Sequence, residues 1–143
     1  MIDITYKPDV YREAIAEGKI KLRKETLKLI KEGKVEKGDV LSASQIASIL
    51  AVKKTPELLP LCHPIPITHV SVNWFFGEDY LGVRVTVKTT AKTGAEMEAL
   101  TGVLTALLNV WDMVKKYEKD EKGRYPYTLI YDVRVIKKSK QEA

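Results

Sequence analysis

The stretch "THVSVNWFFGEDYLGVRVTVKTTA", residues 68–91, decides the fold. Apolar and polar residues alternate on both sides of "GED" (77–79), and alternation with a period of two puts one set of side chains on one face of a strand. The apolar positions are Val70, Val72, Trp74, Val83, Val85 and Val87. Because the connecting segment is short, the two strands can pair with each other. The sequence therefore predicts a β-hairpin with one apolar face.

Residues 94–118, directly after the hairpin, have the pattern of a long amphipathic helix. The large apolar residues at helical intervals are Met97, Leu100, Leu104, Leu107, Leu108 and Trp111. The T-x-x-E pattern of Thr93 and Glu96 predicts a capping box, in which the Glu96 carboxylate accepts a hydrogen bond from a free backbone N–H. Glu98 lies ~200° further around the helix, so the cap does not account for Glu98.

Upstream of the hairpin, loose alternation over residues 12–22 predicts a strand. Residues 24–33 then have apolar side chains at helical spacing and end at Gly33, a residue suited to a helix C-cap. A second helix is expected to be capped by Ser42 or Ser44. Its apolar residues are Ile46, Ile49 and Leu50.

Prolines interrupt the chain after this second helix. Pro56 restricts how far the helix runs, and three prolines within residues 60–66 predict an irregular or edge segment. A final strand is expected from residue 128. The whole chain, 1–143, is predicted to be a single domain with a core over 3–137 and a frayed tail over 138–143. The order of elements favours an α+β fold close to the ferredoxin-like arrangement, a mainly antiparallel sheet with helices packed on one face.

Composition narrows the class of protein. The chain has 143 residues, 45% of them hydrophobic, which is typical of a globular protein. Apolar runs such as "GVLTALLNVW" are shorter than the ~20 residues that cross a bilayer, and the N-terminus lacks the pattern of an export signal. The single cysteine, Cys62, fits a reducing cytoplasm, and with His63 and His69 it falls short of a zinc ligand set. We therefore expect a cytoplasmic protein without membrane association, metal or cofactor.

The net charge of +5 is concentrated in residues 19–37, which carry eight basic and three acidic side chains. A basic surface favours phosphates, although a solvated Lys/Glu face explains the same pattern. The glycine-rich phosphate-binding motifs GxxxxGK[ST] and GxGxxG are both missing. The strand "VRVTVKT" (83–89) also has no aromatic residue for stacking RNA bases. A basic nucleotide- or RNA-binding module without catalysis remains the alternative to an enzyme.

Several polar residues are candidates for chemistry, although each has an ordinary structural interpretation. His63 stands between Cys62 and Pro64 in the rigid proline-rich segment, where Cys62 alone would be a small buried hydrophobic residue. Asp112 and Lys115 are three residues apart and would form a surface ion pair on the helix. Lys37 lies where a loop meets a helix.

Four segments together closely resemble the molybdenum cofactor biosynthesis protein C (MoaC) family. The segments are "KGDVLSASQIASILAVKKT" (37–55), "LCHPIPIT" (61–68), "KTGAEMEALTGV" (92–103) and "WDMVKKYEKD" (111–120). The resemblance runs from about residue 3 to residue 137. Trp111, where the family more usually has Tyr, and Val114, often Cys in relatives, are departures that exchange one apolar side chain for another.

The resemblance implies a cyclic pyranopterin monophosphate synthase, which converts a cyclised dihydro-GTP to cyclic pyranopterin monophosphate and releases pyrophosphate. By the same resemblance, the catalytic residues would be Lys37, Asp112 and Lys115. The substrate-binding residues would be Arg12, Lys53, Leu61, Cys62, His63, Glu96, Met97 and Glu98. Glu96 is thus expected to act partly as a cap, whereas Glu98 is better explained by the ligand.

Helix geometry adds an expectation about assembly. Glu98 and Asp112 are 14 residues apart, which is ~21 Å along a helix at 1.5 Å per residue. Both cannot touch one reacting centre from the same chain, so if both belong to a single active site, that site must combine two subunits. The sequence predicts a homo-oligomer, and the family resemblance suggests a hexamer built as a trimer of dimers.

Overall fold

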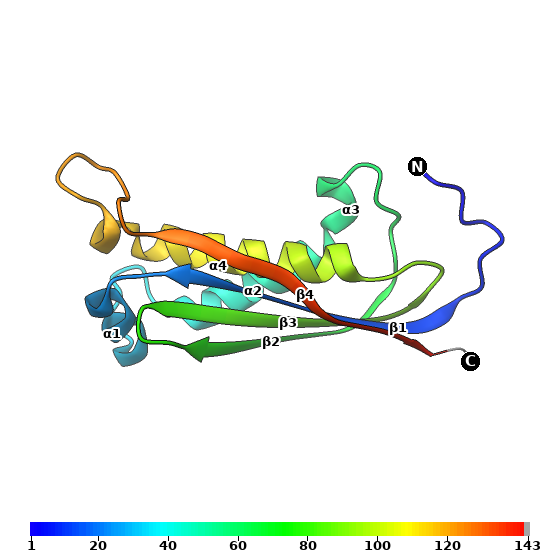
Figure 1. The fold of residues 1–143 in the computed structure, drawn as a ribbon, viewed down its shortest axis with the longest axis horizontal. Coiled ribbons are helices and arrows are strands. Elements are labelled where there is room, and N and C mark those ends of the chain that lie inside the picture. Colours follow the sequence, from blue (N-terminus) through cyan, green and yellow to red (C-terminus); the bar gives the residue numbers. More distant parts are fainter. Residues whose placement is uncertain (142–143) are drawn as a thin grey trace.

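The structure, a computed structural model, describes residues 1–141. It contains a four-stranded sheet in the order β2-β3-β1-β4, with helices packed against it. Every neighbouring pair of strands is antiparallel, which is the ferredoxin-like arrangement and confirms the predicted α+β class. Figure 1 shows α2 and α4 together along the sheet, with α1 at one end of the molecule and the N-terminus at the other. The elements are β1 (Val10–Lys21), α1 (Lys24–Glu32), α2 (Val40–Lys53), α3 (Thr55–Leu58), β2 (Ile67–Phe76), β3 (Tyr80–Ala91), α4 (Glu96–Glu118) and β4 (Leu129–Gln141).

The predicted hairpin is the β2–β3 pair, closed by a hydrogen bond from Gly77 N to Tyr80 O of 2.9 Å. Val72 pairs with Val85, and Trp74 pairs with Val83. The valines of β3 are fully buried, as expected for the face that the helices cover. The alternating pattern therefore identified both the strands and their buried face.

The apolar face predicted for α4 is partly wrong. The helix packs on the sheet and on α2 mainly through small residues, and the larger Met97, Leu104 and Leu108 are 42%, 47% and 63% exposed. At Gly102, a Cβ would lie 2.8 Å from Val52 Cγ2 of α2. The close approach requires a small residue at this contact, although the large Leu107 and Met113 are buried at other positions of the helix. The buried residues of α4 are Glu98, Ala99, Gly102, Val103, Ala106, Leu107, Val110, Met113, Val114 and Glu118.

By length and composition alone, α4 is also apolar enough to cross a membrane. Half of its most apolar 18-residue window is nevertheless buried inside the fold. A helix with this burial is explained by its place in the core. Its length and apolar composition alone are weak support for a membrane span.

Two predicted boundaries are wrong. Helix α2 begins at Val40, capped by Asp39 and not by a serine, because Asp39 Oδ1 accepts a hydrogen bond of 3.1 Å from Ser42 N. The tail predicted to fray from residue 138 is strand as far as Gln141, which pairs with Tyr11 of β1. Backbone pairing with β1 holds this polar segment although few of its side chains are buried. Residues 142–143 of the predicted tail lie outside the described residues.

A buried carboxylate that the sequence analysis missed ties together the end of the molecule that carries α1. Glu118 is fully buried at the end of α4. It accepts hydrogen bonds from the hydroxyls of Thr26 in α1 and Thr128 before β4, and from the backbone N–H of Arg23. Because these partners satisfy both oxygens, the carboxylate joins α4 to α1 and to β4.

Candidate active site

The predicted site residues divide between the two ends of α4. At its N-terminal end, a cleft of about 500 Å³ is lined by Leu59, Pro60, Leu61, Cys62, His63, Thr93, Gly94, Glu96 and Met97; we call it the N-terminal cleft. Near its C-terminal end, a cleft of about 330 Å³ is lined by Leu108, Trp111, Asp112, Lys115 and Ile130; we call it the C-terminal cleft. The two clefts belong to one helix but not to one site within the chain.

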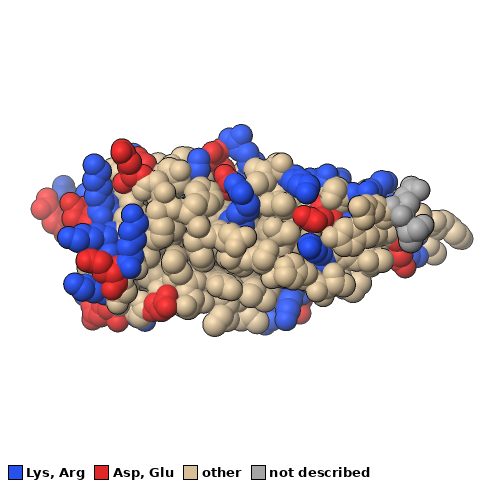
Figure 2. All heavy atoms as spheres, turned by 90° about the horizontal axis from the view of Figure 1, so that it is seen from below, with Lys and Arg blue, Asp and Glu red and all other residues tan. Residues whose placement is uncertain are grey.

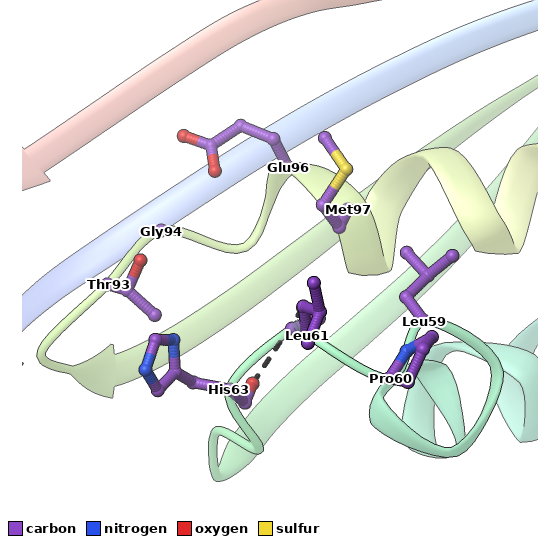
Figure 3. A pocket seen from close by; sticks show the side chains of 9 residues that line it. Leu59, Pro60, Leu61, His63, Thr93, Gly94, Glu96 and Met97 are labelled. Carbon is purple, nitrogen blue, oxygen red and sulfur yellow. Dashed lines mark hydrogen bonds between the residues drawn. The ribbon is translucent and has the colours of Figure 1, made fainter. Parts of the chain in front are cut away.

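The walls of the N-terminal cleft come from the proline-rich segment and from the start of α4. Figure 3 shows Leu61 facing Met97 across the cleft, with His63 close to Thr93. Leu61 is 71% exposed, so its side chain is available to a ligand. His63 Nε2 lies 2.7 Å from the carbonyl oxygen of Ile2, which brings the N-terminal segment beside the cleft.

Glu98 lies beneath this cleft. It is 1% exposed, and its Oε2 lies 3.9 Å from Cys62 Sγ. Its Oε1 is buried and has no hydrogen-bond partner among the described residues. Burial raises the pKa of Glu98, and burial beside this carboxylate also raises the pKa of the Cys62 thiol. An unpaired buried carboxylate is unfavourable for folding, which fits the expectation that Glu98 serves a ligand.

The predicted capping box is wrong. Ala95 is the N-cap of α4, and it forms no side-chain capping hydrogen bond. The Glu96 carboxylate instead forms an ion pair of 2.7 Å with Lys138 of β4. Burial raises the pKa of Glu96, but hydrogen bonds from Lys138 and from the Glu96 backbone N–H, with the charges of Lys138 and Arg12, outweigh burial, so the pKa is below its ordinary value. The T-x-x-E pattern could not predict this partner because β4 lies far away in the sequence.

Arg12 approaches the N-terminal cleft from β1. It is 8% exposed, and its guanidinium donates hydrogen bonds to the carbonyl oxygens of Ala91 and Lys92 at 3.2 and 3.3 Å. Arg12 therefore holds the connection from β3 to α4. It also lines a small cavity with Lys138, Ser139 and Lys140. The sequence analysis missed these β4 lysines because it treated their segment as a frayed tail.

In the C-terminal cleft, Asp112 lies between two ammonium groups. Lys115 Nζ is 3.2 Å from Asp112 Oδ1, and Lys37 Nζ is 3.2 Å from Oδ2 and 2.9 Å from the Asp112 carbonyl oxygen. Hydrogen bonds from Lys115 and then Lys37 hold the pKa of Asp112 below its ordinary value of 3.8. The three side chains are 42–55% exposed, so a substrate can reach them. The structure thus brings together the three residues predicted to be catalytic.

Lys53, a predicted site residue, lies apart from both groups. It ends α2 with an exposed side chain, and it lines neither of the two clefts in the described part of the chain. Within residues 1–141, moreover, no three His, Cys, Asp or Glu side chains are close enough to hold a metal ion.

Several basic side chains of the segment 19–37 contact aromatic rings or acidic side chains of the same chain. Lys21 lies over the ring of Tyr127 at 4.4 Å, and Lys31 over Phe76 at 4.8 Å. Figure 2 shows basic and acidic side chains interspersed at the end of the molecule that carries α1.

The fold and the clefts together define the class: a ferredoxin-like α+β protein with a lysine–aspartate–lysine cluster in one cleft and a second, separate cleft. Residues 1–141 match the MoaC family. A "probable cyclic pyranopterin monophosphate synthase" of Pyrococcus furiosus is 61% identical over 142 residues, which cover 99% of this chain and 91% of the relative. Proteins of the same description from Pyrococcus horikoshii and Sulfurisphaera tokodaii are 64% and 59% identical over 140 residues, which cover 98% of this chain and 88% and 93% of the relatives.

The chain belongs to the MoaC family. The family predicted from the four sequence motifs is therefore confirmed, and so is the enzyme class, a cyclic pyranopterin monophosphate synthase of molybdenum cofactor biosynthesis.

Proposed function

We propose that this chain converts a cyclised dihydro-GTP to cyclic pyranopterin monophosphate and releases pyrophosphate, by lysine/aspartate acid–base catalysis at a site shared between two subunits. The observation that carries the proposal is the position of Asp112 between Lys37 and Lys115. Rebuilding a purine as a pterin requires several proton transfers, and positioned acids and bases accelerate such steps about 100- to 10,000-fold. A cytoplasmic location stays a prediction.

The acid–base group is assembled before substrate arrives. Because its pKa is lowered, Asp112 is ionised near neutral pH and attracts both ammonium groups. In this arrangement Lys37 and Lys115 can exchange protons with a substrate in the C-terminal cleft, while Asp112 fixes their positions.

The N-terminal cleft supplies the binding groups. Leu61 and Met97 provide apolar surface for a flat heterocycle, and the Glu98 carboxylate can accept hydrogen bonds from purine N–H groups. Cations near the triphosphate would offset the charge of the leaving pyrophosphate. We assign this role to His63, which lines the cleft, and to Arg12 and Lys53.

The position of the two clefts supports a site shared by two copies of the chain. Exposed Leu104 and Leu108 form an apolar stripe along α4 from Met97 to Asp112. Leu104 lies about midway between the clefts, so a two-fold axis beside Leu104 would set two α4 helices antiparallel. Each N-terminal cleft would then face the C-terminal cleft of the other copy, as isologous contact requires. We propose this dimer as the active unit, assembled three times in a hexamer.

The test is to incubate the protein with the cyclised dihydro-GTP and to measure released pyrophosphate and the pterin product. Lys37→Ala and Lys115→Ala should abolish turnover while the circular dichroism spectrum is retained. Lys28→Ala, an exposed lysine of α1, is the matched control and should keep full turnover. A non-catalytic basic binding module would instead show no turnover and no greater effect of Lys37→Ala than of Lys28→Ala on nucleotide binding.

A further inference from the structure

Lys37 lies in the loop between α1 and α2, which is flanked by two glycines. Gly33 has φ of 67° and Gly38 has φ of 121°, both in the region that glycine adopts without strain. Val35 is 5% exposed and fixes the middle of the loop to the core. Lys37 itself is exposed and has a long side chain, so its position depends on how the backbone beside it is held.

Helix α4 holds that backbone at the residue before Lys37. The N–H of Glu36 donates a hydrogen bond of 2.9 Å to the hydroxyl of Tyr117. The ring of Tyr117 is half-buried and packs against the core. The hydroxyl is therefore a fixed acceptor, five residues beyond Asp112 on the same helix.

A second contact from α4 reaches Glu36, but it is weaker. Lys116 Nζ forms an ion pair with the Glu36 carboxylate, and the two side chains are 60% and 67% exposed. Exposed ion pairs contribute little because water and salt screen them. The hydrogen bond that the Glu36 N–H donates to the hydroxyl of the rigid Tyr117 ring therefore fixes the loop more firmly than the ion pair does.

We propose that Tyr117 is a positioning residue that acts through Lys37: its hydroxyl fixes the Glu36 backbone and so keeps Lys37 Nζ beside Asp112. The effect on turnover rests on the proposed catalytic role of Lys37, whereas the effect on the Lys37–Asp112 contact does not. Figure 1 shows the end of α4 and the α1–α2 loop at the same end of the molecule.

Tyr117→Phe removes the hydroxyl and keeps the ring. We expect kcat to fall about threefold to tenfold, the size of one lost hydrogen bond, with KM unchanged because the main binding groups belong to the other cleft. In a Lys37→Ala background, Tyr117→Phe should not change the pKa of Asp112 further, because its effect passes through Lys37. Tyr11→Phe also removes a hydrogen-bonded hydroxyl, on β1, and should leave kcat unchanged. Lys116→Gln should change kcat less than twofold.

A carbon-13 titration of the Asp112 carboxyl by NMR measures the contact without substrate. In Tyr117→Phe the pKa of Asp112 should rise toward its ordinary value because Lys37 is held less closely, and Tyr11→Phe should not change it. An unchanged Asp112 pKa in Tyr117→Phe overturns the proposal, whatever happens to kcat. If the pKa rises while Lys37→Ala remains fully active, Tyr117 still positions Lys37, and the catalytic role of Lys37 is what fails.

Discussion

Lys37 Nζ lies 3.2 Å from Asp112 Oδ2, although the two residues are 75 positions apart in the chain. The contact brings the α1–α2 loop to helix α4, and Lys115 completes it from the same helix. We predict that Asp112→Asn lowers kcat at least about 100-fold, since the amide lacks the charge that holds the ammonium groups of Lys37 and Lys115 in place. The urea midpoint should hardly change because the three side chains are exposed. Steady-state kinetics and urea unfolding test both statements, and an active Asp112→Asn enzyme would contradict the assigned role.

The same cluster gives a pH prediction. The folded-state pKa of Asp112 lies below 3.8, chiefly because of Lys115 and then Lys37. A lowered pKa means that the stabilising contact is fully present above pH 3.8 and is lost as the pH falls through the folded-state value. In Lys115→Ala, the NMR-detected pKa of Asp112 should move up toward 3.8. Lys119→Ala, one turn further along the chain, is the control and should leave that pKa unchanged.

The ionised Glu98 carboxylate should lower the stability of the fold at neutral pH, compared with a neutral side chain at the same position. Its folded-state pKa is raised above 4.5 by burial, so stability falls as the pH rises from 4.5 through the folded-state value. Glu98→Gln should therefore raise the free energy of unfolding at neutral pH, by on the order of 1 kcal/mol, while binding of substrate weakens.

The gain from Glu98→Gln should shrink as the pH falls below 4.5, where wild-type Glu98 is protonated. Urea unfolding at several pH values measures it, with the exposed Glu25→Gln as control. A variant less stable than wild type at neutral pH would show that Glu98 has a structural role instead.

Sequence patterns predicted the features that depend on neighbouring residues. Alternation gave the β2–β3 hairpin, and Gly33 adopts the left-handed conformation that ends α1. The wrong predictions concern residues whose structure depends on contacts with a segment far away in the sequence. Glu96 pairs with Lys138 and does not form a cap, and β4 continues to Gln141 because β1 offers a strand edge. Met97, Leu104 and Leu108 of α4 are exposed, and the small Gly102 lies at the close contact with α2.

The site was predicted through the family motifs, and the structure explains why spacing alone was insufficient. Glu98 and Asp112 are 14 positions apart, which predicts a distance of ~21 Å along the helix. The spacing does not predict how far each side chain is buried. Glu98 is buried because the segment containing Cys62 covers it, whereas the Asp112 side chain is 55% exposed although Lys37 of the α1–α2 loop contacts it. Two residues near one helical face therefore have opposite environments.

Gly102 should tolerate no larger residue. A Cβ there would lie 2.8 Å from Val52 Cγ2 and 3.1 Å from both Ser48 Oγ and Val85 Cγ1. Gly102→Ala should lower the free energy of unfolding by about 1–3 kcal/mol, because α2 or the sheet must move. Gln45→Ala, exposed on α2, should change it by less than about 0.5 kcal/mol. If Gly102→Ala were as stable as wild type, α2 and α4 would not be in such close contact.

A site shared by two subunits predicts that inactive variants rescue each other. Glu98→Gln damages the N-terminal cleft and Asp112→Asn the C-terminal cleft, so a mixed dimer has one intact site and one site with both substitutions. Co-refolding equal amounts should restore about a quarter of wild-type turnover, since random pairing makes half the dimers mixed.

Pairing Asp112→Asn with Lys37→Ala is the control. Both changes lie in the C-terminal cluster, so every site keeps one defect and no rescue is expected. Absence of rescue in the first mixture, with dimers present by ultracentrifugation, would show that each subunit works alone.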